Sequence, residues 1–353
     1  MSKFDISQNI RANIAALSPY SCARDEFDGF DALFLDANEN PYDSGYNRYP
    51  DPRQRELKAR LAEIKGVAAE RMVIGNGSDE IIDMLIRSIC EPGCDSIAVF
   101  EPGYSMYKVC ADINNVGVYS LSLNQEFLPD WEALGAALLI DSNIKIVFIC
   151  TPNNPIGKSV PLTQIVELCN SFNGWVVVDE AYIDFAEQAS MSCYLDKFKN
   201  LVVMQTLSKA WGMAGLRLGI CMADEELVDV LNKVKYPYNV NCISQKIALD
   251  LLSNVESFEA RVQQVKSERS RLAQLFIERG YFDKVWEFDG NFLLVSLPRF
   301  SELYGYLAER GVVVRKRDIP PLIPNSLRIT IGTPLQNEVL VELIDNFMNG
   351  DVL

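Results

Sequence analysis

Short runs of consecutive apolar residues alternate with stretches of helical spacing along much of the chain. Fully apolar strands separated by helices are typical of a parallel sheet that is covered on both faces. The sequence therefore predicts an α/β fold whose large domain has a mostly parallel central sheet flanked by helices. The runs that predict its strands span residues 72–77, 96–100, 145–150, 175–178 and 201–204.

The stretches between these runs carry apolar residues three and four positions apart. Leu57, Leu61 and Ile64 follow this spacing, so we expect a helix that begins near residue 53. Further helices are expected from Ser78, over 162–170 and over 224–235.

The pattern changes after residue 240. One long amphipathic stretch, 244–279, predicts one or two helices, and short runs at 291–297, 312–315 and 327–331 predict strands of a smaller α+β domain. We expect an N-terminal arm that forms part of the small domain, a large domain and a small C-terminal domain, with the divisions 1–35, 36–243 and 244–353.

A long loop rich in proline, glycine, asparagine and aspartate precedes the first helix of the large domain, at residues 36–52. It contains Tyr42, Tyr46 and Tyr49, which are too apolar for full exposure to water. Loops of this length usually carry function.

The chain contains no histidine, and this absence excludes several kinds of catalytic and metal-binding site. Serine or cysteine nucleophiles paired with histidine are excluded, as are metal sites with a histidine ligand, and no metal is expected. Acid–base chemistry near neutral pH must fall to Lys, Tyr, Asp, Glu or a cofactor.

The net charge of −15 argues against nucleic acid or an anionic membrane surface as a partner. No apolar run is long enough to span a bilayer, and the first residues lack the apolar core of a signal peptide. Nine cysteines without a CxxC pair predict reduced, buried, intracellular thiols. We therefore expect a cytoplasmic protein with no nucleic-acid or membrane partner.

Polar side chains lie just beyond the predicted strand ends. Because ligands bind at the carboxyl ends of parallel strands, these residues are expected to converge. Lys209 follows the strand at 201–204, in a segment with three glycines, which suits an amine that forms a Schiff base. Taken alone, Ser208-Lys209 is a weak signal, because most lysine side chains are solvated at the surface. The converging residues are Tyr104, Asn154, Asp179, Tyr182 and Lys209.

A glycine turn leads into the helix that starts at Ser78, in the sequence NGSDE. The free N–H groups and the dipole of a helix start favour an anion. Ordinary capping of the helix by the Ser78 side chain explains the same sequence.

Together these residues match what pyridoxal 5′-phosphate needs from a protein. Lys209 can form the imine, and Asp179 can keep the pyridine nitrogen protonated so that the ring acts as an electron sink. Tyr104 can cover one ring face, while Asn154 and Tyr182 can bond to the phenolic oxygen. The phosphate can be held by Ser78, the Asp79 N–H, Thr206, Ser208 and Arg217.

The sequence resembles the fold-type-I aminotransferases that use this cofactor, and within them the histidinol-phosphate aminotransferases. The resemblance covers nearly the whole chain in the expected order. The matching segments are LDANENPY (35–42), NRYPDP (47–52), GNGSDEIID (75–83), EPGYSMYKV (101–109), TPNNPIG (151–157), VVDEAYIDF (177–185), TLSKAWGMAGLRLG (206–219) and LRITIGTP (327–334).

The resemblance implies further site residues. It implies a homodimer in which Tyr49 reaches the cofactor phosphate of the neighbouring subunit. It also implies that Arg328 and Arg315 bind the substrate anion, together with Asn154, and that Tyr20 closes the substrate pocket. Arg315 lies in the run VVVRKR, where Lys316 or Arg317 could be misread for it.

The activity implied is transamination of L-histidinol phosphate with 2-oxoglutarate, giving imidazole-acetol phosphate and L-glutamate in histidine biosynthesis. Lys209, Asp179 and Tyr182 would be the catalytic residues. An aromatic amino-acid aminotransferase or a phospho-amino-acid decarboxylase of the same fold is the nearest alternative. A nucleotide-binding protein that uses the GNGSDE loop is a different class, but the chain has neither GxGxxG nor GxxxxGK[ST].

Overall fold

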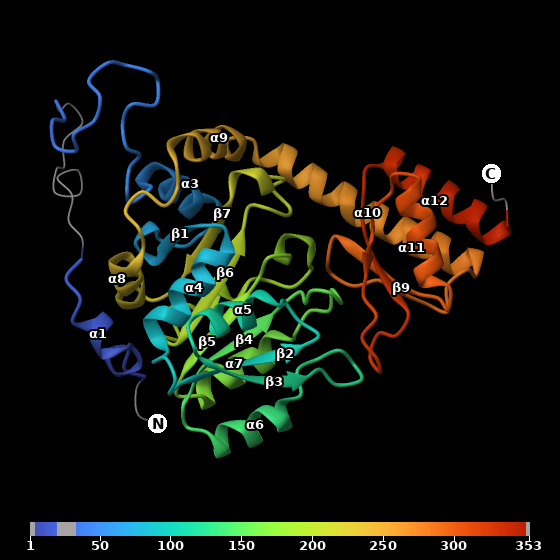
Figure 1. The fold of residues 1–353 in the computed structure, drawn as a ribbon, viewed down its shortest axis with the longest axis horizontal. Coiled ribbons are helices and arrows are strands. Elements are labelled where there is room, and N and C mark those ends of the chain that lie inside the picture. Colours follow the sequence, from blue (N-terminus) through green and yellow to red (C-terminus); the bar gives the residue numbers. More distant parts are fainter. Residues whose placement is uncertain (1–3, 20–32, 351–353) are drawn as a thin grey trace.

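The computed structural model describes residues 4–19 and 33–350. It contains two β-sheets, each packed against helices, as Figure 1 shows. Seven strands form the first sheet and four form the second. The order in the larger sheet is β1 (Met72–Asn76), β7 (Leu218–Met222), β6 (Leu201–Thr206), β5 (Trp175–Asp179), β4 (Ile144–Cys150), β2 (Ser96–Glu101) and β3 (Gly117–Ser122).

The larger sheet is mostly parallel, which confirms the predicted α/β class. Only β7 runs against its neighbours, and it pairs antiparallel with both β1 and β6. Every other neighbouring pair in this sheet is parallel.

Helices cover both faces of this sheet because the strands are apolar on both sides. In β5, Val176 and Val178 belong to one buried core, whereas Trp175 and Val177 belong to the other. The first core also contains residues of α3 (Arg55–Lys65), α6 (Trp131–Ile140), α7 (Leu162–Ser171) and α9 (Cys242–Leu252). The second contains residues of α4 (Ser78–Ile89), α5 (Met106–Ile113) and α8 (Glu225–Val234).

The smaller sheet is antiparallel throughout and lies beside the long helix α10 (Val255–Arg279), to the right in Figure 1. Its strands are β10 (Arg315–Lys316), β11 (Ser326–Thr330), β9 (Phe292–Ser296) and β8 (Lys284–Trp286), in that order. Helices α11 (Phe300–Glu309) and α12 (Pro334–Asn349) complete its core. The divisions at residues 35 and 243 stay a prediction.

The first described residues pack against the larger unit. Ile6 and Ile10 are buried in its second core, and the Trp175 indole N–H donates to the Asn9 carbonyl at 2.9 Å. The shorter helices of the chain are α1 (Ala12–Ala15), η1 (Ser7–Asn9), η2 (Ala69–Arg71), η3 (Ile183–Phe185), η4 (Met191–Tyr194) and η5 (Ala214–Leu216). Within the described residues, no helix combines the length and the apolar character needed to cross a bilayer.

Three strands were not expected from the sequence. β3 lies at the sheet edge and is only partly buried, so it lacks a continuous apolar run. β7 contains Gly219, which weakens the strand signal, and β8 is only three residues long.

The prediction that the cysteines are buried is wrong for two of them, because Cys94 and Cys193 are exposed. All the cysteines in the described part of the chain are free thiols.

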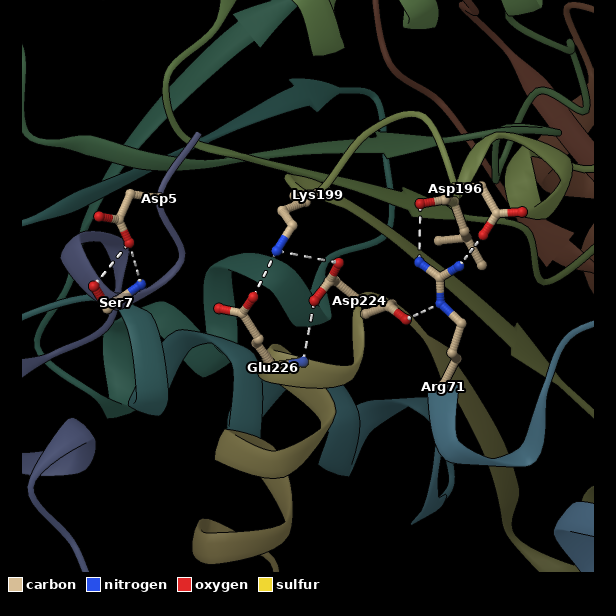
Figure 2. A network of polar contacts seen from close by, with 9 residues as sticks. Asp5, Ser7, Arg71, Asp196, Lys199, Asp224 and Glu226 are labelled. Carbon is tan, nitrogen blue, oxygen red and sulfur yellow. Dashed lines mark hydrogen bonds and ion pairs between the residues drawn. The ribbon is translucent and has the colours of Figure 1, made fainter. Parts of the chain in front are cut away.

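Arg71 ties together segments that are distant in sequence, in the polar network of Figure 2. Its guanidinium donates to the Ala223 carbonyl at 3.0 Å and to the Leu195 carbonyl at 2.9 Å, and it forms an ion pair with Asp196. Because Ala223 follows β7 directly, Arg71 holds the beginning of β1 against the end of β7.

Candidate active site

A pocket of about 500 Å³, counted with its open mouth, lies at the carboxyl edge of the larger sheet. Thr206, Asp179 and Cys150 are the last residues of β6, β5 and β4, so the three neighbouring strands all end in its wall. The pocket contains every cofactor-binding residue expected from the sequence except Tyr49. The lining residues are Ser78, Asp79, Tyr104, Cys150, Asn154, Asp179, Ala181, Tyr182, Thr206, Ser208, Lys209 and Arg217.

Lys209 stands in the tight loop that follows β6. The loop is fixed by the Ser208 N–H, which donates to the Thr206 hydroxyl at 3.1 Å, and by a bond from the Gly212 N–H to the Lys209 carbonyl at 3.0 Å. Burial lowers the pKa of the Lys209 amine, and the nearby positive charge of Arg328 lowers it further. A larger neutral fraction makes this amine a better nucleophile and base than a surface lysine.

A cup that is suited to an anion forms where α4 begins. Gly77 precedes the helix with φ +82°, and there is no capping bond from a side chain, so capping by Ser78 is wrong. The first N–H groups of α4 are therefore available, as at any helix start. Arg217 lies over this turn, and its carbonyl accepts the Gly77 N–H at 2.7 Å.

Two glycines make the cup possible. A Cβ added at Gly77 would lie 2.5 Å from Arg217 Nη2, and one added at Gly219 would lie 2.5 Å from the Ser78 nitrogen. Antiparallel β7 thus brings Arg217 back against the start of α4. Gly219 is required there because a Cβ would meet backbone atoms, and Gly77 is required because its φ is positive.

Asp179 is almost completely buried at the end of β5, with 3% exposure. Burial raises the pKa of its carboxyl, and a hydrogen bond from Tyr107 opposes this rise. The Ala181 N–H donates to Asp179 Oδ1 at 3.1 Å. The carboxylate is therefore held on both oxygens.

Two tyrosines flank the pocket. The Tyr104 hydroxyl donates to Asp79 at 2.7 Å, and Arg217 Nη2 lies 3.5 Å from the same carboxylate. The Tyr182 ring lies 5.6 Å from Lys209 Nζ, and burial raises the pKa of its hydroxyl to about 12. Both hydroxyls are therefore neutral donors at physiological pH.

Strands of the smaller sheet supply the cations beside the pocket. Arg328 on β11 bonds through Nη1 to Asn154 Oδ1, so it reaches the pocket wall. Arg315 is directly opposite Arg328 in the β10–β11 register, and Arg317 continues this pairing by donating its N–H to the Ser326 carbonyl at 2.8 Å. Because side chains alternate along a strand, Arg315 and Arg317 share the face of Arg328.

The register also sets Lys316 apart from the two arginines beside it. Lys316 points to the other face, where its Nζ lies 4.6 Å from the Tyr304 ring centroid and 3.4 Å from the Ser301 hydroxyl. Burial lowers the pKa of Arg317, and the charges of Arg328 and Arg315 lower it further. Arg317 therefore belongs to the same cluster, whereas Lys316 does not.

Among the expected residues that the structure describes, Tyr49, Arg315 and Arg328 do not line this pocket. Tyr49 is exposed and its ring stacks on Tyr238, with centroids 4.5 Å apart. Tyr20 lies outside the described residues.

Sequence reasoning missed Tyr107 and Cys150 as neighbours of Asp179. Tyr107 lies on the buried face of α5 with Cys110 and Ala111, so its spacing indicates only a core residue. Cys150 is the last residue of an apolar strand and gives no separate signal.

The residues of the pocket fit pyridoxal 5′-phosphate. The close-approach glycines and the cation at the start of α4 suit its phosphate, and the buried carboxylate of Asp179 suits its ring nitrogen. Lys209 lies in the same pocket and suits its carbonyl carbon.

Comparison with known proteins is consistent with this chemistry. The family described as aminotransferase class I and II matches residues 30–344. A histidinol-phosphate aminotransferase of Christiangramia forsetii is 44% identical over 351 residues, covering 99% of this chain and 100% of the relative. One from Parabacteroides distasonis is 46% identical over 342 residues, covering 97% and 99%.

Solved structures share the fold. Histidinol-phosphate aminotransferase from Clostridium acetobutylicum superposes with a TM-score of 0.78 at 22% identity, covering 87% of this chain and 92% of that one. The Sinorhizobium meliloti enzyme, in complex with pyridoxal-5′-phosphate, gives 0.76 at 21% identity, covering 85% and 84%.

Proposed function

The chain belongs to the class I and II aminotransferases, and from this premise we propose that it transfers the amino group of L-histidinol phosphate to 2-oxoglutarate. The products are imidazole-acetol phosphate and L-glutamate, a step of histidine biosynthesis. The observation that carries the proposal is the arginine face of the smaller sheet beside the Lys209 pocket, because both substrates bring an anion to it.

The family uses pyridoxal 5′-phosphate, which supplies an electron sink conjugated with the bond that breaks at the substrate Cα. Lys209 would attach the cofactor covalently, and Asp179 would bind its ring nitrogen. Asn154 and Tyr182 would donate to its phenolic oxygen, and Tyr104 would cover its ring. The groups that would hold its phosphate are Ser78, Asp79 through its N–H, Thr206, Ser208 and Arg217.

Lys209 would have a second task when its Nζ is free. The Nζ would act as the general base that takes the proton from the substrate Cα. The lowered pKa supports this role, because a base must be neutral before it can accept a proton. No histidine is needed for such a reaction.

Arg328 and Arg315 would bind the phosphate of the donor and the distal carboxylate of the acceptor in turn. A guanidinium offers a planar fork of N–H donors that matches either anion. Tyr20 would close the pocket over the substrate. The bond from Arg328 to Asn154 supports this arrangement, since it links the anion side to the cofactor side.

A substrate comparison tests the proposal. Purified holoenzyme is assayed with 2-oxoglutarate and either L-histidinol phosphate or phenylalanine, and carbon dioxide release is followed with threonine phosphate. We expect turnover that is fastest with L-histidinol phosphate and no decarboxylation. Faster turnover of phenylalanine, or release of carbon dioxide, would replace the proposal with one of the two alternatives.

We propose that the enzyme is a homodimer in which Tyr49 acts on the neighbouring subunit. Large apolar side chains of the loop before α3 support this, with Leu35 80% and Tyr42 82% exposed. Tyr49 lies outside the pocket of its own chain, as the proposal requires.

Subunit mixing tests the dimer directly. Lys209→Ala and Tyr49→Ala should each be inactive or nearly so, but a mixed dimer would contain one intact site. Unfolding and refolding the two variants together should restore about a quarter of the wild-type activity, because half of the dimers would be mixed. Activity no higher than that of the separate variants would exclude sharing of Tyr49.

We also propose a cytoplasmic location. The free thiols of the described cysteines support a reducing compartment. Localisation of a fluorescent fusion in the native host tests it, and export of the fusion would contradict it.

A further inference from the structure

Tyr107 makes a buried contact with the carboxylate of Asp179 that none of the roles above uses. Its hydroxyl donates to Asp179 Oδ2 at 2.5 Å, and the tyrosine itself is only 3% exposed. Its ring stacks on Phe148 of β4 with centroids 4.6 Å apart and planes at 13°. Ring position and hydroxyl direction are therefore both fixed by packing.

The charges around Asp179 explain why such a donor matters. Burial and the nearby carboxylate of Asp79 both favour the protonated acid, while Lys209 favours the ion. The Cys150 thiol also lies near the Tyr107 hydroxyl and is held neutral by burial. Within the described residues, the donor to Asp179 Oδ2 is the neutral O–H of Tyr107.

The second oxygen of Asp179 has a different partner. Oδ1 accepts the backbone N–H of Ala181, and that bond is set by the turn after β5 rather than by any side chain. Substitution can therefore remove the Tyr107 bond while the Ala181 bond stays. The stacking of the Tyr107 ring on Phe148 does not involve the hydroxyl, so phenylalanine at position 107 would pack equally well.

We propose that Tyr107 is a positioning residue whose hydroxyl keeps the Asp179 carboxylate ionised and aimed at the cofactor ring nitrogen. This inference rests on the role given to Asp179 in the proposed function. Asp179 and the ring nitrogen share one proton, which stays on nitrogen only while the carboxylate is the weaker base. The Tyr107 hydrogen bond stabilises the ionised carboxylate and so leaves the proton on nitrogen.

The variant Tyr107→Phe removes one oxygen and keeps the ring. The holoenzyme is loaded with cofactor labelled with ¹⁵N in the ring, and the ¹⁵N chemical shift is measured by NMR. We expect the shift to move from the pyridinium range toward neutral pyridine. We also expect kcat to fall about tenfold or more with KM changed by about twofold or less, as for loss of a hydrogen bond to a charged group.

Tyr119→Phe is the matched control, because the Tyr119 hydroxyl also lies near an aspartate, Asp141, and Tyr119 belongs to the edge strand β3. It should change neither the shift nor kcat. A Tyr107→Phe holoenzyme whose nitrogen stays as protonated as in the wild type would overturn the inference, even if its melting temperature were lower.

A second replacement covers the case in which Tyr107→Phe does not fold. Site-specific 3-fluorotyrosine at position 107 keeps the ring and makes the hydroxyl a stronger donor. The nitrogen should then remain protonated, and a shift toward neutral pyridine would overturn the inference. Failure of the proposed function is distinguishable, because the wild type itself would then not transaminate L-histidinol phosphate whatever the nitrogen shift.

Discussion

The two sheets present opposite arrangements of charge to the same pocket. On the side of the larger sheet, carboxylates are paired with protein donors: Asp179 with Tyr107, and Asp79 with Tyr104 and Arg217. On the side of the smaller sheet, within the described residues, the arginines 315, 317 and 328 share a face, and no ion pair joins any of them to a carboxylate.

Under the proposed function, this difference would distinguish the side that holds the cofactor permanently from the side that binds each substrate in turn. Paired groups are already oriented, so they can hold a cofactor through every turnover without rearranging. Unpaired arginines repel one another, as the lowered pKa of Arg328 and Arg317 indicates after the effect of burial. In the proposed function, an anion brought by the substrate would relieve this repulsion, so the arginine face would be stabilised only when substrate binds.

Removing the amine from the cofactor side should have the largest effect. Lys209→Ala should lower kcat by about 10⁴-fold or more, because both the covalent anchor and the base are lost. Single-turnover assays with L-histidinol phosphate measure this. Lys199→Ala is the control, since Lys199 pairs with Glu226 on the remote surface shown in Figure 2. Measurable multiple turnover by Lys209→Ala would contradict the assignment.

Removing the shared cation of the substrate side should come next. Arg328→Gln should lower kcat/KM about 100-fold for both L-histidinol phosphate and 2-oxoglutarate, through loss of a charge-assisted, forked hydrogen bond. Steady-state kinetics with each substrate varied in turn provide the measurement. A loss confined to one substrate would mean that the two anions do not use the same arginine.

A smaller effect should distinguish the two anions. Arg317→Gln should raise KM for the phosphate substrate about tenfold and KM for 2-oxoglutarate about twofold, because a phosphate dianion gains more from a third cation. Lys316→Gln is the matched control on the opposite face of the same strand. Equal changes for both substrates would leave Arg317 without a role in selectivity.

The smallest expected effect concerns how the stability of the larger unit depends on pH. Glu180 is buried beside Asp179, and burial raises the pKa of its carboxyl to about 7 from an ordinary 4.5. The contribution of Glu180 to the free energy of unfolding is full below pH 4.5 and is lost as the pH rises through 7. The loss amounts to roughly 3 kcal/mol.

Glu180→Gln should remove part of this pH dependence, so that the melting temperature falls less between pH 5 and pH 8 than in the wild type. The site can accept an amide because the buried Gln205 Oε1 has no partner and can turn toward it. Melting curves of the cofactor-free protein at the two pH values measure the difference. Glu226→Gln, an exposed control, should leave the slope unchanged.

The sequence predicted the cofactor side better than the substrate side. Tyr104, Asp179 and Lys209 each follow an apolar strand, and parallel strands must end at one edge, so their convergence follows from topology. Separating Lys316 from Arg315 and Arg317 needs the β10–β11 register, which two adjacent residues of strand cannot reveal.

Two other features needed the three-dimensional structure for a similar reason. The contact between Arg217 and Gly77 depends on β7, and Gly219 makes this strand hard to recognise in the sequence. The contact between Tyr107 and Asp179 joins a helix to a strand end, and neither residue differs in pattern from an ordinary core position.

The reversed strand β7 has a consequence for the order in which the protein is made. As the ribosome releases the chain, β1 and the start of α4 emerge long before β7, which must insert between β1 and β6. Contacts between segments so distant in sequence form late, because a long loop must close first. The cup at the start of α4 can therefore form only after the nascent chain has been made beyond Met222. Uptake of cofactor by a nascent chain would then indicate that the larger sheet is complete.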